Sequence, residues 1–540
     1  MRARLLCGCG LAALLAACSN GSSIVRADAG SADVGLVDAA PGDAGLADLA
    51  PGQEAATASD AGSGADTGLG DGGQTDAAQA DVAQADAAQA DASPAEDASG
   101  QDAAIGADAG AADAAVDAPS GYDASVQHAF HVRQGAAGDG SDWQSALGAL
   151  PAQLQRSAIY YVADGDYHPS GYTFDDPAAG QDLIIVRKAT AADHGTDTGW
   201  DAAFGDGVAQ FGPLTFTGAY TIFDGVFAYG FRVVGGYQGF IVDITDTADH
   251  VTVRCSDLDG NFQTNASGYH TGGVCNGVDI TGSYVTLQAN DIHNIADDGV
   301  GVYGQHLVFE GNRIHRLHGC GTDNGCGPCY NGHSDGLELN ATTDVVMRGN
   351  LVYDIQSTSA LITGQFGPGD YTRDLVLENN IFYTPAVGLT VYLYYVQGAR
   401  VVNNVIWGRT QGTRYGGLSL GPELTNLDLR NNIILNINFT HLGGSFNAAE
   451  HRMHDNLYGM IDAGEYTAAA DEIVGDPRFV NILMSGNEAD HPPDITAEDF
   501  RLQTGSPAID RADPAFAPAL DFFGAARVGA PDLGAIEHQP

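Results

Sequence analysis

The sequence has very few cationic side chains. Lysine and arginine together number 22 against 69 aspartates and glutamates, the formal net charge is −47, and Lys188 is the one lysine. Binding to nucleic acid relies on cationic contacts to phosphate, so this balance argues against a nucleic-acid partner. It also disfavours gripping a polyanion, unless local arginines or a bound cation reverse the field.

Long apolar runs are missing as well. The N-terminal run from Leu5 to Ala16 is too short for a membrane helix, which needs about 20 residues. It follows Arg2 and Arg4 and ends in small residues, which is the order of a secretory signal peptide. No other segment is long and apolar enough to be a transmembrane helix.

The end of this signal, Leu15-Ala-Ala-Cys18, resembles a bacterial lipobox. The resemblance implies a signal peptide over residues 1–17, cleavage before Cys18, and acylation of that cysteine as a membrane anchor. Ser19 at the next position implies, by analogy with enteric bacteria, a cell-envelope protein of the outer membrane that is exposed at the cell surface. An ordinary secretory signal cut elsewhere, with Cys18 uninvolved, is the alternative.

Bulky side chains are scarce between residues 18 and 126, which consist almost wholly of Ala, Asp, Gly, Ser and Gln. Aspartates recur every five residues, at Asp28, Asp33, Asp38, Asp43 and Asp48 and again at Asp71, Asp76, Asp81, Asp86 and Asp91. A period of five fits neither a helix nor a strand, and 20 acidic residues against Arg26 repel one another. We expect a disordered, extended tether, with weak helix around the Ala-Gln repeats as the alternative.

The remaining chain, residues 127–540, carries 49 acidic and 19 basic residues and five cysteines. In an oxidising compartment disulfides are the default state, and an odd number leaves one thiol over. The disulfide candidates are Cys255, Cys275, Cys320, Cys326 and Cys329. Cys255 and Cys275 lie about one repeat apart and are predicted to bridge neighbouring turns. The other three, flanked by His318 and His333, predict a stapled loop or a zinc site.

One phrase recurs from Leu287 onward: an apolar residue, two further residues, asparagine, any residue and another apolar residue. The asparagines are Asn290, Asn312, Asn350, Asn380, Asn404 and Asn432, with Asn456 in a weaker last copy. Their spacings of 22, 38, 30, 24, 28 and 24 are typical of a solenoid, whose loops lengthen without disturbing the stack. Asparagine tolerates left-handed backbone and bonds the residues around a turn, so these positions predict an asparagine ladder.

Short strands such as Tyr284–Leu287 and Leu375–Leu377, separated by Gly, Asn and Asp turns, fit a coil of about three strands. An antiparallel sandwich would explain the strands but not one asparagine in every turn. The repeats resemble those of pectin-lyase-like proteins. The resemblance implies an all-β fold over residues 127–540, a single-stranded right-handed parallel β-helix, which we expect to be a monomer.

Two flanking segments agree with this resemblance. Trp143–Leu154 predicts a short amphipathic capping helix before the strand Ile159–Val162, which resembles the N-terminal cap, at about 127–170, of secreted β-helices. Such a cap covers the open end of the core. Asp499–Asp510 and Asp532–Glu537 resemble the C-terminal closing segment of such proteins, at about 475–540.

A second polar column accompanies the asparagines. It consists of the pairs Asn276-Gly277, Asp298-Gly299 and Asp335-Gly336, each at the start of a strand. Aligning their glycines stacks the three polar residues in consecutive turns. The longest insertion falls between the last two of these turns, and loops on a rigid scaffold often carry function.

Asp297, Asp298, His333 and Asp335 are therefore the candidate catalytic residues. Stacked turns lie about 4.8 Å apart, so their carboxylates need a shared proton, a Ca²⁺ ion or an arginine between them. The candidate arginines, which would also bind substrate, are Arg313, Arg316 and Arg348. Asp-Gly turns without any chemistry are the alternative.

Polygalacturonase-like enzymes on this fold carry one Asp, an Asp pair and Gly-His-Gly in successive turns. Asp297-Asp298 and His333 resemble the pair and the histidine, but Asn276 stands near the first Asp position and Ser334 follows the histidine. Their closing Arg-x-Lys has no counterpart. Polysaccharide lyases on the fold use a Lys or Arg base with Ca²⁺, and Lys188 lies too early in the chain for that role.

Two functions remain open at this point. The first is a surface-anchored glycoside hydrolase or polysaccharide lyase that uses the candidate residues in a groove along the helix. The second is a non-catalytic rod that binds glycan, adheres or supports structure. For the enzyme and for a glycan-binding rod, the expected partner is a polysaccharide or cell-surface glycan. The fold alone does not decide between the two functions.

Overall fold

The computed structural model describes residues 126–539, with gaps at 228, 237–238, 262, 265–269, 272–273, 318–333, 357, 365–366, 368, 386–388, 409–415, 422, 436, 439–450, 462–465 and 485–494. The signal peptide, Cys18 and the tether lie outside the described residues. Within the described part, no helix has the length and hydropathy needed to cross a membrane.

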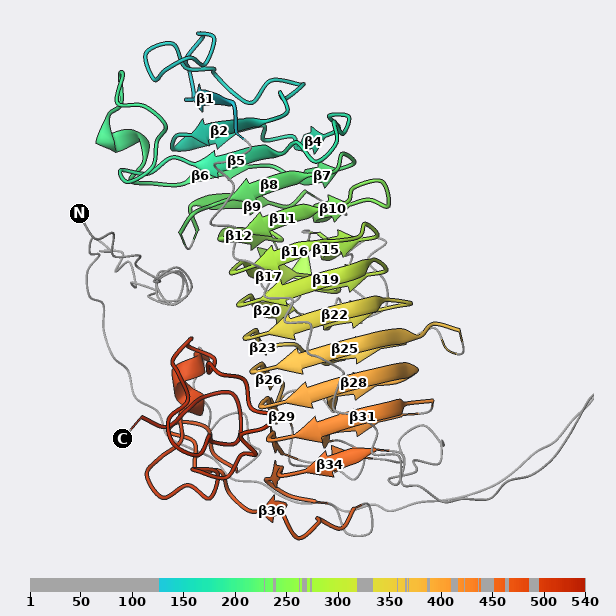
Figure 1. The fold of residues 1–540 in the computed structure, drawn as a ribbon. Helices are drawn as coiled ribbons and strands as arrows, with labels where there is room; N and C mark the ends of the chain where they lie inside the picture. The colour runs from blue at the N-terminus through green and yellow to red at the C-terminus, as the bar shows by residue number, and fades with distance from the viewer. Residues whose placement is uncertain are drawn as a thin grey trace, which may run out of the picture. The chain divides into compact units, whose positions relative to one another are not determined.

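The described residues wind into stacked coils, and each coil between the two ends gives one strand to each of three parallel sheets (Figure 1). Sheet A contains β1 (His128–Val132), β2 (Ala158–Val162), β5 (Ile184–Lys188), β8 (Thr221–Asp224), β11 (Val251–Arg254), β16 (Thr286–Gln288), β19 (Gln305–Glu310), β22 (Thr343–Arg348), β25 (Thr372–Glu378), β28 (Val396–Val402), β31 (Thr425–Arg430) and β34 (Arg452–His454). Sheet B contains β3 (Gly165–Tyr167), β6 (Ala209–Phe211), β9 (Phe231–Val234), β12 (Ser256–Asp259), β17 (Asp291–Ile295), β20 (Arg313–Leu317), β23 (Leu351–Tyr353), β26 (Ile381–Tyr383), β29 (Val405–Trp407), β32 (Ile433–Ile434), β35 (Leu457–Tyr458) and β36 (Ile473–Val474).

Sheet C contains β4 (Tyr172–Phe174), β7 (Leu214–Phe216), β10 (Phe240–Ile244), β15 (Asn276–Ile280), β18 (Val300–Val302), β21 (Asp335–Leu339), β24 (Ser359–Thr363), β27 (Leu389–Leu393), β30 (Gly416–Leu420) and β33 (Ile437–Asn438). A hairpin of β13 (Gln263–Thr264) and β14 (His270–Thr271) and two 3-10 helices, η2 (Ala202–Phe204) and η5 (Ala497–Phe500), stand outside these sheets. The architecture is the right-handed parallel β-helix that the repeats predicted.

The core runs along the axis between the three sheets. Alternate side chains of each strand point inward, and the parallel register places them above one another in successive turns. In sheet A, for example, Leu287 lies over Phe309, Phe309 over Met347 and Met347 over Leu377, all fully buried. This stacking gives every turn a partner above and below, as a repeat fold requires.

The asparagine ladder lies at the corner between sheets A and B. Each Nδ2 donates to the Oδ1 of the next asparagine, at 2.9–3.1 Å, from Asn290 through Asn312, Asn350, Asn380, Asn404 and Asn432 to Asn456. The same oxygens accept the backbone N–H of the preceding asparagine, so these buried amides are satisfied. The left-handed residue of each turn is the one before the asparagine, such as Gly349 or Asn379.

The predicted capping helix over residues 143–154 is wrong. This segment forms turns, and Leu147 makes an isolated parallel bridge to Val132 of β1. The Leu147 N–H donates to the His131 carbonyl at 2.8 Å, and the Arg133 N–H donates to the Leu147 carbonyl at 2.8 Å. Backbone groups that an α-helix would use internally therefore bond to β1, the first strand of sheet A, whose outer edge would otherwise lack partners.

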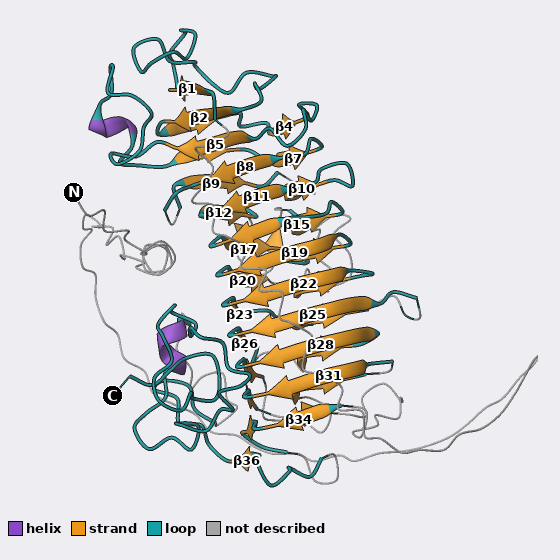
Figure 2. Cartoon of the chain, in the orientation of Figure 1, coloured by secondary structure: helices purple, strands orange, loops and turns teal. Residues whose placement is uncertain are grey.

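The C-terminal segment from about residue 475 lies against the face of sheet B beside β26 to β36, and consists mainly of loops (Figures 1 and 2). Phe479 and Phe500 pack on the outward side chains Tyr383 and Trp407 of that face. Asn403 also donates to the carbonyls of Asp532 and Gly534, at 3.0 and 3.1 Å. The segment thus covers the C-terminal half of one side of the β-helix.

Candidate functional site

The predicted polar column stands at the start of the strands of sheet C. The Gly277 N–H donates to the Asp298 carbonyl and the Gly299 N–H to the Asp335 carbonyl, both at 2.8 Å. Asn276, Asp298 and Asp335 therefore occupy consecutive turns, as the aligned glycines predicted. A Cβ on Gly299 would lie 2.6 Å from the Gly336 carbonyl oxygen, so the glycines beside the column allow the turns to stack this closely.

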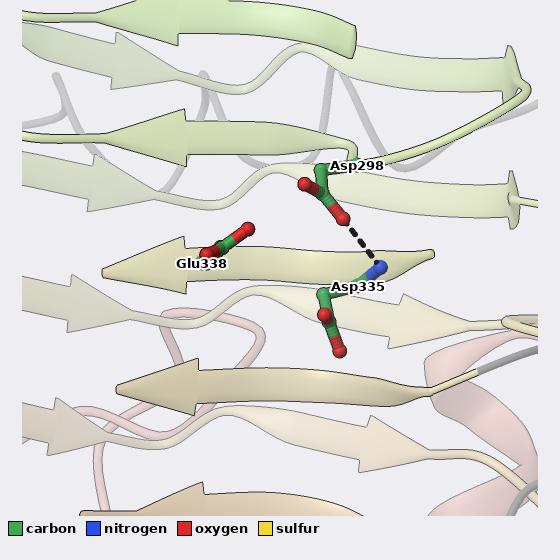
Figure 3. A group of neighbouring side chains, drawn as sticks. All are labelled: Asp298, Asp335 and Glu338. Atoms are coloured by element: carbon green, nitrogen blue, oxygen red, sulfur yellow. Dashed lines mark hydrogen bonds between the residues drawn. The ribbon is translucent and has the colours of Figure 1, made fainter. Parts of the chain in front are cut away.

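Three carboxylates of this region form a compact group (Figure 3). Asp298, Asp335 and Glu338 are 6%, 0% and 7% exposed, and Glu338 is the fourth of the five residues of β21. The Asp335 N–H donates to Asp298 Oδ1 at 2.8 Å, and Ser359 donates to Asp335. One carboxylate oxygen from each of the three residues lies within 4.8 Å of the other two. The sequence singled out Asp298 and Asp335 but missed Glu338.

Glu338 belongs to an outward row of acidic residues along sheet C. The register pairs Asp243 of β10 with Asp279 of β15, Asp279 with Gly301 of β18, and Gly301 with Glu338 of β21. Asp243, Asp279 and Glu338 each lie three residues after the first residue of their strand, at Phe240, Asn276 and Asp335. The recurring pattern of apolar, acidic and apolar residues at this offset was the signal that sequence reasoning overlooked.

Asp279 of this row has a clearly raised pKa. Burial, together with the charge of Asp243 one turn away, raises the pKa of Asp279 to about 6. Burial also raises the pKa of Asp243. A Cβ on Gly301 would lie 3.4 Å from Asp279 Oδ1, so the missing side chain leaves space between Asp279 and Glu338.

Tyr303 lies at the rim of this group, directly after β18, and is 45% exposed. Its pKa is raised, first by burial and then by the negative charge of Glu338, with smaller contributions from Asp279 and Asp298. A phenol that responds to all three carboxylates lies close to them. The acidic row therefore reaches the surface beside an aromatic side chain that can donate a hydrogen bond.

The other candidate residues have different locations. Asp297 is half-buried, and its N–H donates to the Cys275 carbonyl at 2.9 Å. His333 lies outside the described residues. Arg313 and Arg316 are on β20 of sheet B, where Arg313 lies 3.7 Å from Asp291. Arg348, on β22 of sheet A, pairs with Glu378 at 3.1 Å.

Cys275 is disulfide-bonded, as predicted, but its predicted pairing with Cys255 is wrong, because the buried Cys255 is not in a disulfide. Cys255 lies in a left-handed turn between β11 of sheet A and β12 of sheet B, whereas Cys275 precedes β15 of sheet C. The two cysteines thus lie at different corners of the coil, which sequence spacing does not reveal. Cys320, Cys326 and Cys329 fall outside the described residues, so their staple or zinc site stays a prediction.

The group formed by Asp298, Asp335 and Glu338 has the ligand chemistry of a Ca²⁺ site. Ca²⁺ prefers six to eight oxygen ligands, of which carboxylates are the strongest. These three side chains offer carboxylate oxygens that already lie within 4.8 Å of one another. Ca²⁺ binding remains a prediction for this group.

The comparisons with known proteins concern the fold. No protein-family model matches the chain, and no curated protein matches it significantly. Pectate lyase Pel9A has 14% identity and a TM-score of 0.41, with 77% of this chain and 97% of that chain covered. A rhamnogalacturonan lyase has 12% identity and a TM-score of 0.36, with 70% and 97% covered. The Dettilon tailspike protein (gp208) has 14% identity and a TM-score of 0.33, with 59% and 62% covered.

The described residues form a parallel β-helix. Many functions share one fold, so we infer activity only from the side chains of this chain.

Proposed function

We propose that the protein hydrolyses a polysaccharide at the outward row of sheet C, with Asp279 as the proton donor and Glu338 as the carboxylate that activates water. The observation that carries the proposal is the position of Asp279, whose pKa is raised to about 6, opposite Glu338 across Gly301. Two carboxyl groups in different environments are the usual equipment of a glycosidase. At mildly acidic pH Asp279 is partly protonated and can donate a proton.

The spacing of the two residues favours inversion over retention. Asp279 and Glu338 are two turns apart, and two strand spacings amount to about 9.6 Å. Inverting glycosidases separate their carboxyl groups by roughly 6.5–9.5 Å to admit a water molecule, and retaining ones by roughly 5–5.5 Å. Because Gly301 contributes no side chain between them, water and a glycosidic oxygen have room there.

Hydrolysis of a neutral polysaccharide fits this face better than elimination from an acidic one. A lyase needs a basic side chain to remove a proton from its substrate, yet no described strand of sheet C contains Arg, Lys or His. Further along the same row lie Ile362 and Tyr392, paired in register on β24 and β27. An apolar and an aromatic side chain next to acceptors suit a sugar, which has apolar faces and polar edges.

The lipobox and the acidic tether complete the proposal. We infer that acylated Cys18 anchors the chain in the outer membrane and that residues 18–126 extend the β-helix towards its substrate at the cell surface. A non-catalytic glycan-binding rod is the competing function, because Asp298 and Asp335 are buried and bonded within the turns.

The test is release of reducing ends by the full chain from neutral and uronic-acid polysaccharides of plant, algal and bacterial origin, with and without Ca²⁺. We expect hydrolysis of a neutral polymer, with Asp279→Asn and Glu338→Gln each lowering the rate about 10²- to 10⁴-fold. Asp374→Asn is the matched control, since Asp374 is exposed on sheet A in a left-handed conformation that asparagine tolerates. Unsaturated products, or activity that survives both substitutions, would contradict the mechanism, and a folded but inactive protein would favour the rod.

A further inference from the structure

A pocket of about 380 Å³ opens on a different side of the β-helix, on the outer face of sheet B. Its polar lining comes from Asp166, Gln210, Tyr229, Arg232 and Asp257. The volume lies within the range of small-molecule sites, about 300–1,000 Å³. Nothing in the hydrolytic proposal uses these residues, and the inference drawn from them does not rest on that proposal.

Four of the lining residues form one straight row along the helix axis. The register pairs Asp166 of β3 with Gln210 of β6, Gln210 with Arg232 of β9, and Arg232 with Asp257 of β12. Carboxylate, amide, guanidinium and carboxylate groups thus follow one another at intervals of about 4.8 Å. Donors and acceptors alternate along this row, and a hydroxyl group, which both donates and accepts, can bond to either kind.

The row is held in place from one end. Arg232 lies 2.5 Å from Asp259 and 3.4 Å from Asp257, and His293 lies 2.7 Å from the other oxygen of Asp257. The His293 ring stacks on His315 with centroids 5.2 Å apart, and His315 bonds Asp291 at 2.8 Å. Groups fixed in this way lose little conformational freedom when a ligand binds.

The charges of the pocket disfavour an anionic ligand. Asp166, Asp257 and the nearby Asp259 outnumber Arg232, and hydroxyl groups can bond to both kinds of side chain. Arg232 is nevertheless 42% exposed, so a ligand can reach its guanidinium. Tyr229 adds an aromatic ring to the lining.

The C-terminal half of sheet B, from β23 onward, has an apolar outer face that is covered by other residues of the chain. From β23 onward the same row contains Leu351, Ile381, Val405 and Ile433, which the C-terminal segment covers. The polar half, up to Arg313 on β20, keeps Arg232 and Arg313 partly exposed. A polar row beside a pocket, directly continuous with a covered apolar row, indicates a surface adapted for a ligand from outside.

We propose that this pocket is a second carbohydrate site, which binds an uncharged sugar unit through the row from Asp166 to Asp257. It lies on sheet B, whereas the acidic row lies on sheet C, so one protein can hold a glycan at one face while the other face meets substrate. Two such contacts on a tethered rod would raise its effective affinity for a polymeric glycan.

The test is calorimetric titration of the full chain with glucose, galactose, xylose and their β-linked disaccharides, together with glucuronate and glucosamine as charged probes. We expect a neutral sugar to bind with a dissociation constant on the order of 1 mM. Val208→Trp, at an exposed residue that lines the pocket, should weaken that binding at least about tenfold. Gln210→Ala, which removes one polar group without adding bulk, should weaken it less.

Val474→Trp is the matched control, because Val474 is also exposed, lies on the last strand of the same sheet and does not line the pocket. Asp374→Asn, at an exposed residue of sheet A, should also leave sugar binding unchanged. The proposal is overturned if no neutral sugar binds, if a charged probe binds more tightly, or if Val208→Trp and Gln210→Ala bind like the control while all variants keep the wild-type thermal midpoint.

Discussion

The outward rows of sheets B and C place carboxylates on successive turns at the same strand spacing, yet their protonation differs. On sheet C, burial and the neighbouring Asp243 raise the pKa of Asp279 to about 6. On sheet B, burial also favours the neutral form of Asp291, but the hydrogen bond from His315 and the charges of His315, His293 and Arg313 hold its pKa at about 2. The sign of the neighbouring charge, more than the spacing, therefore decides which carboxylate keeps a proton.

The two histidines of sheet B extend this comparison. Burial lowers the pKa of His315 and outweighs the hydrogen bond to Asp291. For His293 burial acts in the same direction, but the hydrogen bond to Asp257 and the charge of Asp291 outweigh it and raise the pKa. On sheet B, histidine and arginine side chains compensate the charge of Asp291. On sheet C, Asp279 lies beside another carboxylate, Asp243, and therefore keeps its proton to a higher pH.

The largest expected effect on the free energy of unfolding comes from removing the carboxylate of Asp291 on sheet B. Asp291→Asn removes the carboxylate that His315 and Arg313 share, and breaking a buried ion pair costs about 3–5 kcal/mol. We expect a destabilisation near the lower figure at pH 7, measured by chemical denaturation beside Asp374→Asn. Because the folded pKa is depressed, the difference from wild type should be full above about pH 4 and vanish as the pH falls through about 2. A difference that grows on acidification would contradict this account.

Ca²⁺ should compensate the negative charges of the carboxylate group on sheet C. If Ca²⁺ binds Asp298, Asp335 and Glu338, a free Ca²⁺ concentration of about ten times the dissociation constant stabilises the folded protein by about 1.4 kcal/mol. The thermal midpoint with and without Ca²⁺ measures this effect. Glu338→Gln should reduce it strongly, whereas the control Asp374→Asn should keep it. An equal Ca²⁺ response in Glu338→Gln would place any bound ion elsewhere.

Removing the negative charge of Asp279 should stabilise the folded protein slightly. Asp279 has a raised folded pKa, so its ionisation costs stability as the pH rises from about 4 through about 6, and the cost stays above that range. We expect Asp279→Asn to be about 1 kcal/mol more stable than wild type at pH 8, after a discount for solvent screening, and equal to it at pH 4. A gain in stability together with lost hydrolysis would separate a catalytic group from a structural one. Destabilisation at both pH values would assign Asp279 a structural task.

The smallest expected effect concerns Asp243. Its charge is the second cause of the raised pKa of Asp279, so Asp243→Asn should lower that pKa while leaving both proposed catalytic groups in place. The rate of hydrolysis, which needs protonated Asp279, should then begin to fall at a lower pH than in wild type. The measurement is the pH profile of the rate at saturating substrate, and an unmoved falling limb would show that another group donates the proton.

Local patterns were sufficient to predict the helical coil. The asparagine phrase predicted the ladder because Asn350 and its counterparts act within one short turn, and the Asp-Gly pairs predicted the stacking of Asp298 and Asp335 because the adjacent glycine marks the close contact between turns. The asparagine phrase and the Asp-Gly pairs each span only a few consecutive residues, so insertions elsewhere in the coil do not change them.

Features that depend on register between turns were not predictable in the same way. Asp243, Asp279 and Glu338 resemble ordinary outward residues until the turns are superimposed, and the stacking of His293 on His315 depends on the same register. The predicted pairing of Cys275 with Cys255 failed because spacing did not show that the two cysteines occupy different corners. The helix prediction failed because the amphipathic pattern of residues 143–154 also suits an irregular segment in which Leu147 bonds to β1.

The asparagine corner has a consequence for how such a protein can change over time. Two residues separate the strands of sheets A and B at every ladder position, for example between Gln288 and Asp291 and between Arg430 and Ile433. The variation in repeat length must therefore fall at the other corners, which flank sheet C. Loops around the acidic row can be exchanged for longer or shorter ones while the ladder preserves the alignment of every strand, so new substrate preferences can arise without a new folding problem.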